Sequence, residues 1–146
     1  MKKPTKAKLK AIAADRIAFA KEIRQDYLDG KLEPNRTASG LGYLIHEAGE
    51  GVQPKPGQRV EVHYVGLLED KPSVFEESFS SARGVRFLLG AGEVIPAWDE
   101  AIALLRWGDE ATLFVPAKLG YGPKGRGQGI PTNSNLIFYV EIASVG

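Results

Sequence analysis

The sequence of 146 residues has no cysteine, one methionine and two histidines. Without cysteine the chain has no disulfides, thiolate metal sites or cysteine nucleophiles. Long hydrophobic runs are also missing: the longest span five residues, at 101–105 and 136–140, and a membrane-spanning helix needs about 18. Hydrophobic residues make up 43% of the chain and charged residues 25%, which are ordinary values for a folded protein. The sequence therefore predicts a globular protein with its own apolar core.

The chain also lacks a large excess of charge of one sign, since it has 19 Lys and Arg and 18 Asp and Glu residues. Residues 1–10 carry five lysines and no acid, and we interpret this basic tail as a solvated terminus. Residues 1–30 are charged throughout and lack the apolar core of about 7–15 residues that a secretory signal requires. We expect a cytoplasmic protein, or a periplasmic one whose signal has been removed, that binds neither nucleic acid nor membrane.

Conventional catalytic and metal-binding patterns are scarce. His46 and His63 are isolated, and strand alternation places His63 toward solvent. No Cys/His cluster has metal-ligand spacing, and no G-x-S-x-G nucleophile elbow occurs. Residues 120–125 formally match G-x-G-x-x-G, but the segment that follows is too rich in Gly and Pro to open a helix. The sequence predicts no metal and no cofactor.

The first part of the chain has the pattern of a helix. Between Lys6 and Leu28 there is neither Gly nor Pro, and Arg16 and Arg24 are the only charges that interrupt an apolar face. Residues 1–40 are therefore predicted to form an amphipathic helical arm followed by a linker. The apolar residues of the face are Leu9, Ile12, Ala13, Ile17, Phe19, Ala20, Ile23 and Tyr27.

Residues 41–146 have the pattern of a single, mainly β domain. Apolar and polar residues alternate with a period of two, and Gly and Pro punctuate the gaps. One segment, 96–105, begins with Pro96 and reads as a short helix. We expect an α+β fold in which an antiparallel sheet buries that helix. The expected strands lie at 43–46, 60–65, 74–76, 85–88, 111–115 and 136–142.

Five segments in register resemble the FKBP-type peptidyl-prolyl cis-trans isomerases. They are VHYVG at 62–66, VFEES at 74–78, RFLLGAGEVIPAWDEAIALL at 86–105, GYG at 120–122 and IPTNSNLIFYVEI at 130–142. The resemblance covers residues 51–146. It implies a half-open sheet of five or six antiparallel strands wrapped around the short helix, with an apolar pocket for a proline ring between them.

The resemblance also implies roles for individual residues. The indole of Trp98 forms the pocket floor, while the Ile95 N–H and the Tyr121 hydroxyl bind substrate carbonyls. The residues assigned to catalysis are Tyr64, Glu76, Trp98 and Tyr121. Those assigned to substrate binding are Phe75, Phe87, Val94, Ile95, Ile130 and Phe138.

Three positions depart from the family pattern. Glu76 stands where the family has Asp, Val85 replaces an aromatic residue, and Gly129 replaces an apolar one. The last two changes predict a wider pocket that binds macrolides such as tacrolimus or rapamycin weakly. The Gly-rich loop between Tyr121 and Ile130 carries two cations beside the pocket, and is expected either to influence the residues flanking proline or to be a mobile, solvated loop.

Two functions are expected from this resemblance. The first is a peptidyl-prolyl isomerase that accelerates rotation about X–Pro bonds during protein folding. The alternative is a proline-binding module with little turnover, recruited through its N-terminal helix; Glu76 is the feature that favours it. The apolar face of that helix must be buried, either in a homodimer or partner complex or on its own domain.

Overall fold

The computed structural model describes residues 3–127 and 129–146, so part of the predicted basic tail and one residue of the Gly-rich loop lie outside it. The elements are α1 (Lys6–Leu28), β1 (Asn35–Arg36), β2 (Gly42–Glu47), β3 (Arg59–Leu68), β4 (Val74–Glu77), β5 (Val85–Leu88), α2 (Pro96–Ile102), β6 (Glu110–Val115), the 3-10 turns η1 (Ala117–Leu119) and η2 (Gly122–Lys124), and β7 (Leu136–Val145). None of the described helices has the length and apolarity to cross a membrane.

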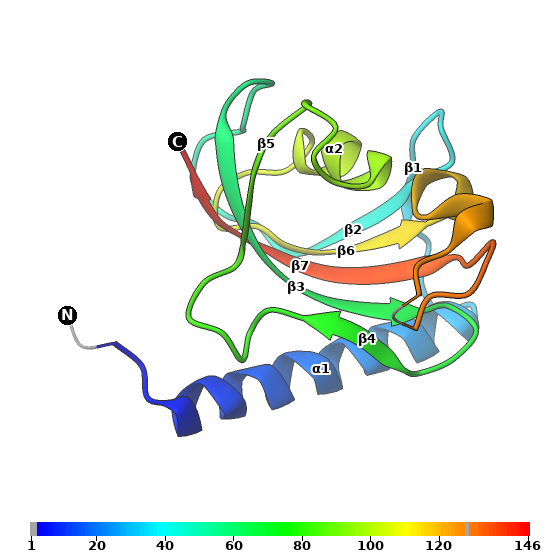
Figure 1. Ribbon diagram of the computed structural model, residues 1–146, viewed down its shortest axis with the longest axis horizontal. Helices are drawn as coiled ribbons and strands as arrows, with labels where there is room; N and C mark the ends of the chain where they lie inside the picture. The colour runs from blue at the N-terminus through cyan, green and yellow to red at the C-terminus, as the bar shows by residue number, and fades with distance from the viewer. Residues whose placement is uncertain (1–2, 128) are drawn as a thin grey trace.

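The strands form one antiparallel sheet in the order β1-β2-β6-β7-β3-β4, with β5 also pairing with β3. The long strands β3 and β7 pair at its centre, where Tyr64 lies opposite Val140 and Gly66 opposite Phe138. The shorter β4 and β5 pair with opposite ends of β3 (Figure 1). The sheet is open and curves around α2, so the predicted fold class is confirmed.

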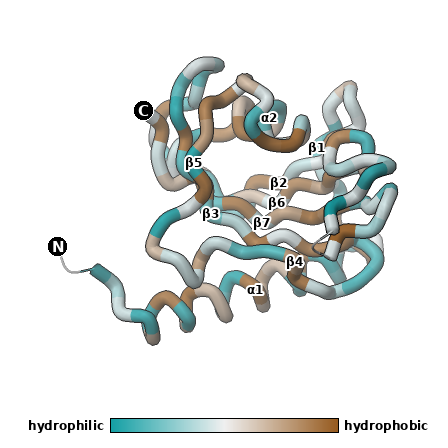
Figure 2. The backbone as a smooth tube through the Cα atoms, in the orientation of Figure 1, coloured by the Kyte–Doolittle hydropathy of each residue, from teal (hydrophilic) through white to brown (hydrophobic). Residues whose placement is uncertain are grey.

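Both faces of the sheet are covered (Figure 1). Along β7, Phe138 and Val140 point toward α2, whereas Ile137 and Tyr139 point toward α1. This division follows from the period-two geometry of a strand, which sends successive side chains to opposite faces. The chain therefore has two apolar layers, one under each helix. Figure 2 shows that the central strands contain apolar stretches.

Helix α1 is docked on the sheet of its own chain. Thr5 caps its first turn by accepting a hydrogen bond from the Lys8 N–H. The two arginines that interrupt its apolar face both have partners in the sheet: the Arg24 Nε donates to the Leu68 and Glu69 carbonyls at 3.1 Å, and the Arg16 Nε to Glu141 at 2.6 Å. These interactions hold the helix along its length, from the β3 end to β7.

Three details differ from the sequence-based expectation. The predicted linker contains β1, a strand of two residues that is too short to show a periodic pattern. Helix α2 ends at Ile102, because the N–H groups of Leu104 and Leu105 bond three residues back, to the carbonyls of Ala101 and Ile102, and tighten the chain into a turn. His63 is half-buried and stacks on Phe79, since α1 and the loop after β4 cover the face expected to be open.

Both histidines have structural partners. A ring nitrogen of His46 lies 2.7 Å from the Thr112 hydroxyl, and one of His63 lies 2.9 Å from the Ser78 hydroxyl. Burial lowers the pKa of His46. Neither histidine lines the cavity described below.

Candidate active site

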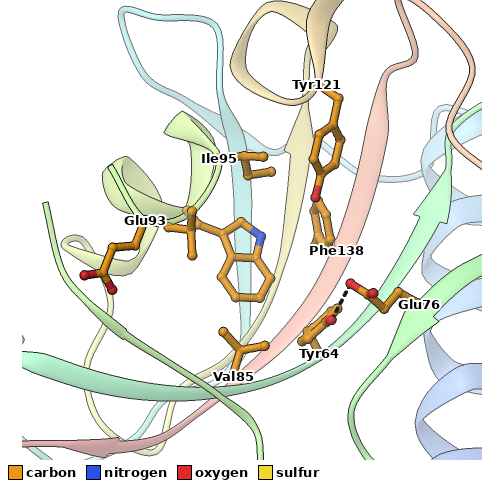
Figure 3. A pocket seen from close by; sticks show the side chains of 9 residues that line it. Tyr64, Glu76, Val85, Glu93, Ile95, Tyr121 and Phe138 are labelled. Carbon is orange, nitrogen blue, oxygen red and sulfur yellow. Dashed lines mark hydrogen bonds between the residues drawn. The ribbon is translucent and has the colours of Figure 1, made fainter. Parts of the chain in front are cut away.

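A cavity of about 150 Å³ opens between α2 and the concave face of the sheet (Figure 3). Strands β3, β4, β5 and β7, helix α2 with the turn before it, and the residue before η2 all contribute to it. Its lining residues are Tyr64, Glu76, Val85, Glu93, Val94, Ile95, Trp98, Tyr121 and Phe138.

The indole of Trp98 forms the base of the cavity. It is 4% exposed, and the rings of Tyr64 and Phe138 meet it edge-on at centroid distances of 5.0 and 5.4 Å. Phe87 packs beside it at 6.0 Å. Among the described residues the indole Nε1 has no hydrogen-bond partner. The result is a rigid aromatic cup, because aromatic rings prefer this edge-to-face packing.

The start of α2 places one edge of the cup. Pro96 occupies the first turn, and Asp99 accepts hydrogen bonds from the Gly90 and Gly92 N–H groups at 2.8 and 3.0 Å. These bonds fix the turn that leads into Ile95, whose carbonyl accepts the Trp98 N–H at 3.0 Å. Within the described part of the chain the Ile95 N–H itself has no acceptor, so it is available to a ligand at the rim.

A carboxylate and a phenol meet on the opposite rim (Figure 3). The Tyr64 hydroxyl donates to Glu76 Oε1 at 2.6 Å. Burial raises the pKa of Tyr64, and the hydrogen bond to the Glu76 carboxylate raises it further, so the phenol stays neutral. The side chain of Glu76 is 41% exposed, which leaves its second oxygen within reach of solvent and of a cation.

That cation is Arg126, from the Gly-rich loop. Its Nη2 lies 3.4 Å from Glu76 Oε2, and its Nη1 donates to the Tyr121 hydroxyl at 3.3 Å. The guanidinium carbon lies 5.2 Å from the centroid of the Tyr121 ring and 5.7 Å from that of Phe75. Arg126 thus connects the β4 side of the cavity with the loop that carries Tyr121.

The structure gathers most of the predicted site residues around one cavity. Those that line it are Tyr64, Glu76, Val94, Ile95, Trp98, Tyr121 and Phe138. The other three are not lining residues: Phe87 and Ile130 are buried behind the walls, and Phe75 packs edge-on against Phe138 at 5.6 Å. They belong to the layer that supports the cup.

Two features of the site were not predicted as such. Glu93 lines the cavity on the side away from Glu76, and its carboxylate accepts the Leu88 N–H at 3.0 Å. The sequence contains one indication that Glu93 belongs to the site: it precedes the predicted binding residues Val94 and Ile95 in the segment GEVIPAW at 92–98. The ion pair between Arg126 and Glu76 joins residues far apart in the chain, and no local pattern indicates it.

Val85 and Gly129 differ in what they do at the pocket. Val85 lines the cavity, as expected for a residue in a wall position. Gly129 has φ +88°, a conformation that side chains with a Cβ rarely adopt, and an added Cβ would lie 3.6 Å from that of Phe75. Gly129 is not among the residues that line the cavity, and its backbone conformation accounts for the glycine.

In the described part of the chain, no group of three or more His, Asp or Glu side chains is arranged to hold a metal ion. The polar groups at the cavity are instead hydrogen-bond donors and carboxylates on its rim. The cavity that these groups surround is small and has an apolar base.

Comparison with known proteins agrees with this geometry. The family model described as "FKBP-type peptidyl-prolyl cis-trans isomerase" matches residues 50–143. A probable FKBP-type isomerase of Haemophilus influenzae is 37% identical over 97% of this chain and 57% of its own length. The isomerase FkpA of Escherichia coli K12 is 36% identical over 99% of this chain and 52% of its own length. This chain thus spans about half the length of these relatives.

Solved structures give the same result. The crystal structure of FkpA from Escherichia coli has a TM-score of 0.72 and 36% identity, covering 95% of this chain and 63% of that one. The crystal structure of AtFKBP13 has a TM-score of 0.73 and 32% identity, covering 79% of this chain and all of the other. The chain therefore belongs to the FKBP-type peptidyl-prolyl cis-trans isomerase family.

Proposed function

We propose that this chain accelerates cis–trans rotation about X–Pro bonds in polypeptides. The observation that carries the proposal is the small cavity over the Trp98 indole, apolar at its base and lined by donors at its rim. A dry cavity of about this volume in a protein core is large enough for a ring the size of benzene. A pyrrolidine ring is comparable in size, so the cavity has room for a proline side chain.

The chemistry requires no nucleophile. Rotation about a peptide bond faces a barrier of about 18–20 kcal/mol because the resonance of the planar amide must be broken. X–Pro bonds therefore isomerise in tens to hundreds of seconds, slowly enough to limit folding. The twisted amide at the top of the barrier carries less separated charge than the planar form. An apolar cup destabilises the planar form more, which lowers the barrier.

Polar groups at the rim of the cavity would orient the X–Pro bond of the substrate. The free Ile95 N–H and the Tyr121 hydroxyl lie on the α2 side and the loop side of the cavity, each able to donate to a substrate carbonyl (Figure 3). Trp98, Phe138 and Tyr64 would contact the ring itself. Each 1.4 kcal/mol of preferential stabilisation of the twisted amide gives about a tenfold gain in rate.

A protease-coupled assay on short X–Pro peptides tests the proposal. We expect the intact chain to increase the isomerisation rate in proportion to its concentration, and Trp98→Ala to abolish most of the increase. Thermal unfolding and circular dichroism of the variant establish that it is folded. A wild-type rate equal to the spontaneous one would refute isomerase activity.

A second function, proline binding without useful turnover, is favoured by Glu76. The extra methylene relative to the family's Asp carries the carboxylate further from the β4 backbone, where it reaches Tyr64 and Arg126. The variant Glu76→Asp separates the two functions. An inactive wild type that gains activity from this substitution would establish the binding module.

Partners and compartment are further proposals. We infer proline-containing polypeptides as substrates, weak binding of macrolides, and a cytoplasmic location unless a signal has been removed, which cell fractionation tests. The docking of α1 on its own sheet favours burial of its apolar face within one chain over a homodimer through the helix. Light scattering on the intact chain and on a chain that begins near Ala38 tests this preference.

A further inference from the structure

Arg126 is held at the rim of the cavity by its backbone. Its N–H donates to the Ile130 carbonyl at 2.8 Å, and the Ile130 N–H donates back at 3.1 Å, so the two residues form an isolated antiparallel bridge. Ile130 is buried in the core behind the cavity wall. The backbone of Arg126 is therefore held in place by hydrogen bonds to a buried residue.

The guanidinium is also fixed at its far end. It lies over the rings of Phe75 and Tyr121 and forms an ion pair with Glu76, and its side chain is 28% exposed. Its Nε and Nη2 are buried and make no hydrogen bond of good geometry within the described residues. Its directional bonds come from Nη1, which reaches Glu76 Oε1 at 3.5 Å and the Tyr121 hydroxyl at 3.3 Å.

The direction of the bond to Tyr121 has a chemical consequence. A guanidinium only donates hydrogen bonds, so the Tyr121 oxygen must be the acceptor. The hydroxyl hydrogen of Tyr121 then remains free to donate. Tyr64 has the opposite arrangement, because its hydrogen is directed to the Glu76 carboxylate. Of the two phenols at the rim, Tyr121 is the one left ready to donate to a ligand.

A cation that donates to a hydroxyl oxygen also strengthens the hydroxyl as a donor, because hydrogen bonds in a chain polarise one another. This effect is larger when one partner is charged and partly buried. The neighbouring Glu76 holds the guanidinium in place from the other side. The three side chains thus form a chain of contacts that runs from β4 to the Tyr121 hydroxyl.

We propose that Arg126 is a positioning residue, which orients and polarises the Tyr121 hydroxyl as the donor to the substrate carbonyl. The inference rests on the proposed isomerase function and adds to it a loop residue that acts through Tyr121. Its removal should lower kcat/KM about three- to tenfold, the loss expected for weakening one hydrogen bond.

A double-mutant cycle on the full chain tests the inference with the same X–Pro peptides. Arg126→Met keeps the length of the side chain and removes the charge and the donors. We expect it to lower kcat/KM in the wild-type background and to change it less than about twofold in the Tyr121→Phe background, where there is no hydroxyl to polarise. Arg126→Lys, which retains a cationic donor, should recover part of the loss.

The matched control is Arg106→Met, which removes one positive charge from an exposed arginine that does not line the cavity and should leave kcat/KM unchanged. Equal losses from Arg126→Met in both backgrounds, or no loss in either, would overturn the inference while leaving the isomerase function intact. A wild-type chain without turnover would overturn the proposed function and this inference with it.

Discussion

The Tyr64 hydroxyl on β3 donates a 2.6 Å hydrogen bond to Glu76 on the neighbouring β4, so that one rim of the cavity is closed by a phenol and a carboxylate. The bond crosses the end of the sheet where β4 pairs with β3. It binds a short edge strand to the centre of the fold, and it belongs to the site at the same time. Changes at Glu76 should therefore affect both stability and activity.

We predict that Glu76→Ala lowers the free energy of unfolding by about 1 kcal/mol, the cost of leaving one hydroxyl without its partner where water can partly replace it. Glu76→Gln keeps an acceptor and should lose less. Urea unfolding measures both. In the Tyr64→Phe background the effect of Glu76→Ala should shrink; an undiminished effect would mean that another contact of Glu76 carries the stability.

Stability should also fall at alkaline pH because of two buried phenols. Burial and the adjacent carboxylates raise the pKa of Tyr64 and of Tyr139, whose hydroxyl donates to Glu141 at 2.6 Å. An unfolded tyrosine loses its proton near pH 10, whereas these two keep it in the folded state. The folded chain then binds more protons, and its stability decreases with rising pH.

The loss begins at the ordinary tyrosine pKa and amounts to at most about 1.4 kcal/mol per pH unit for each group. It should be absent at neutral pH. Urea unfolding between pH 9 and pH 11 measures the slope, with Tyr139→Phe as the comparison. A slope in the variant equal to that of the wild type would rule out a contribution from Tyr139.

Local pattern was sufficient to predict the elements that place the site. The strands β3 and β7 follow a period of two, and Pro96 marks the start of α2. The cup around Trp98 was expected from the resemblance to the isomerase family, and the structure places a cavity there. The docking of α1 on the sheet, by contrast, could not be predicted from the sequence. The partners of its two arginines are Glu141 and the backbone carbonyls at the end of β3. Side chains that look misplaced on a helical wheel are explained only by groups that folding brings to them.

At the cavity, too, the sequence could not show which residues folding brings into contact. The family resemblance assigned aromatic side chains to the pocket, but it did not show which of them reach the surface of the cavity, because that depends on how two layers of rings pack. Phe87 and Ile130 lie behind the wall for this reason. The ion pair of Arg126 depends on the path of a Gly-rich loop, which has no periodicity to read.

The expectation that Val85 widens the pocket, where the family has an aromatic residue, predicts a gain of macrolide affinity when the aromatic ring is restored. Val85→Phe adds apolar surface to a residue that already lines the cavity, and it should tighten binding of tacrolimus or rapamycin about tenfold. Titration calorimetry measures the Kd. Val52→Phe, at an exposed valine outside the cavity, is the control and should change nothing. Unchanged or weaker binding by Val85→Phe would contradict a pocket widened at this position.

Arg24 offers the sharpest test of the helix that covers the outer face of the sheet. Its side chain is buried, and its Nε donates to the carbonyls of Leu68 and Glu69, at the end of β3. Arg24→Met keeps the apolar stem but leaves both carbonyls without this donor, so the free energy of unfolding should fall by about 2 kcal/mol.

Lys21→Met, at an exposed position of the same helix, removes the same charge and should cost little. Hydrogen exchange distinguishes local from global effects, since a weakened contact at Arg24 should release the amides of α1 before those of β3 and β7. If the released helix then exposes its apolar face, light scattering of the variant should show association that increases with concentration. A variant as stable as the wild type, with α1 amides equally protected, would mean that the apolar contacts of Ala20 and Ile23 hold the helix without the arginine.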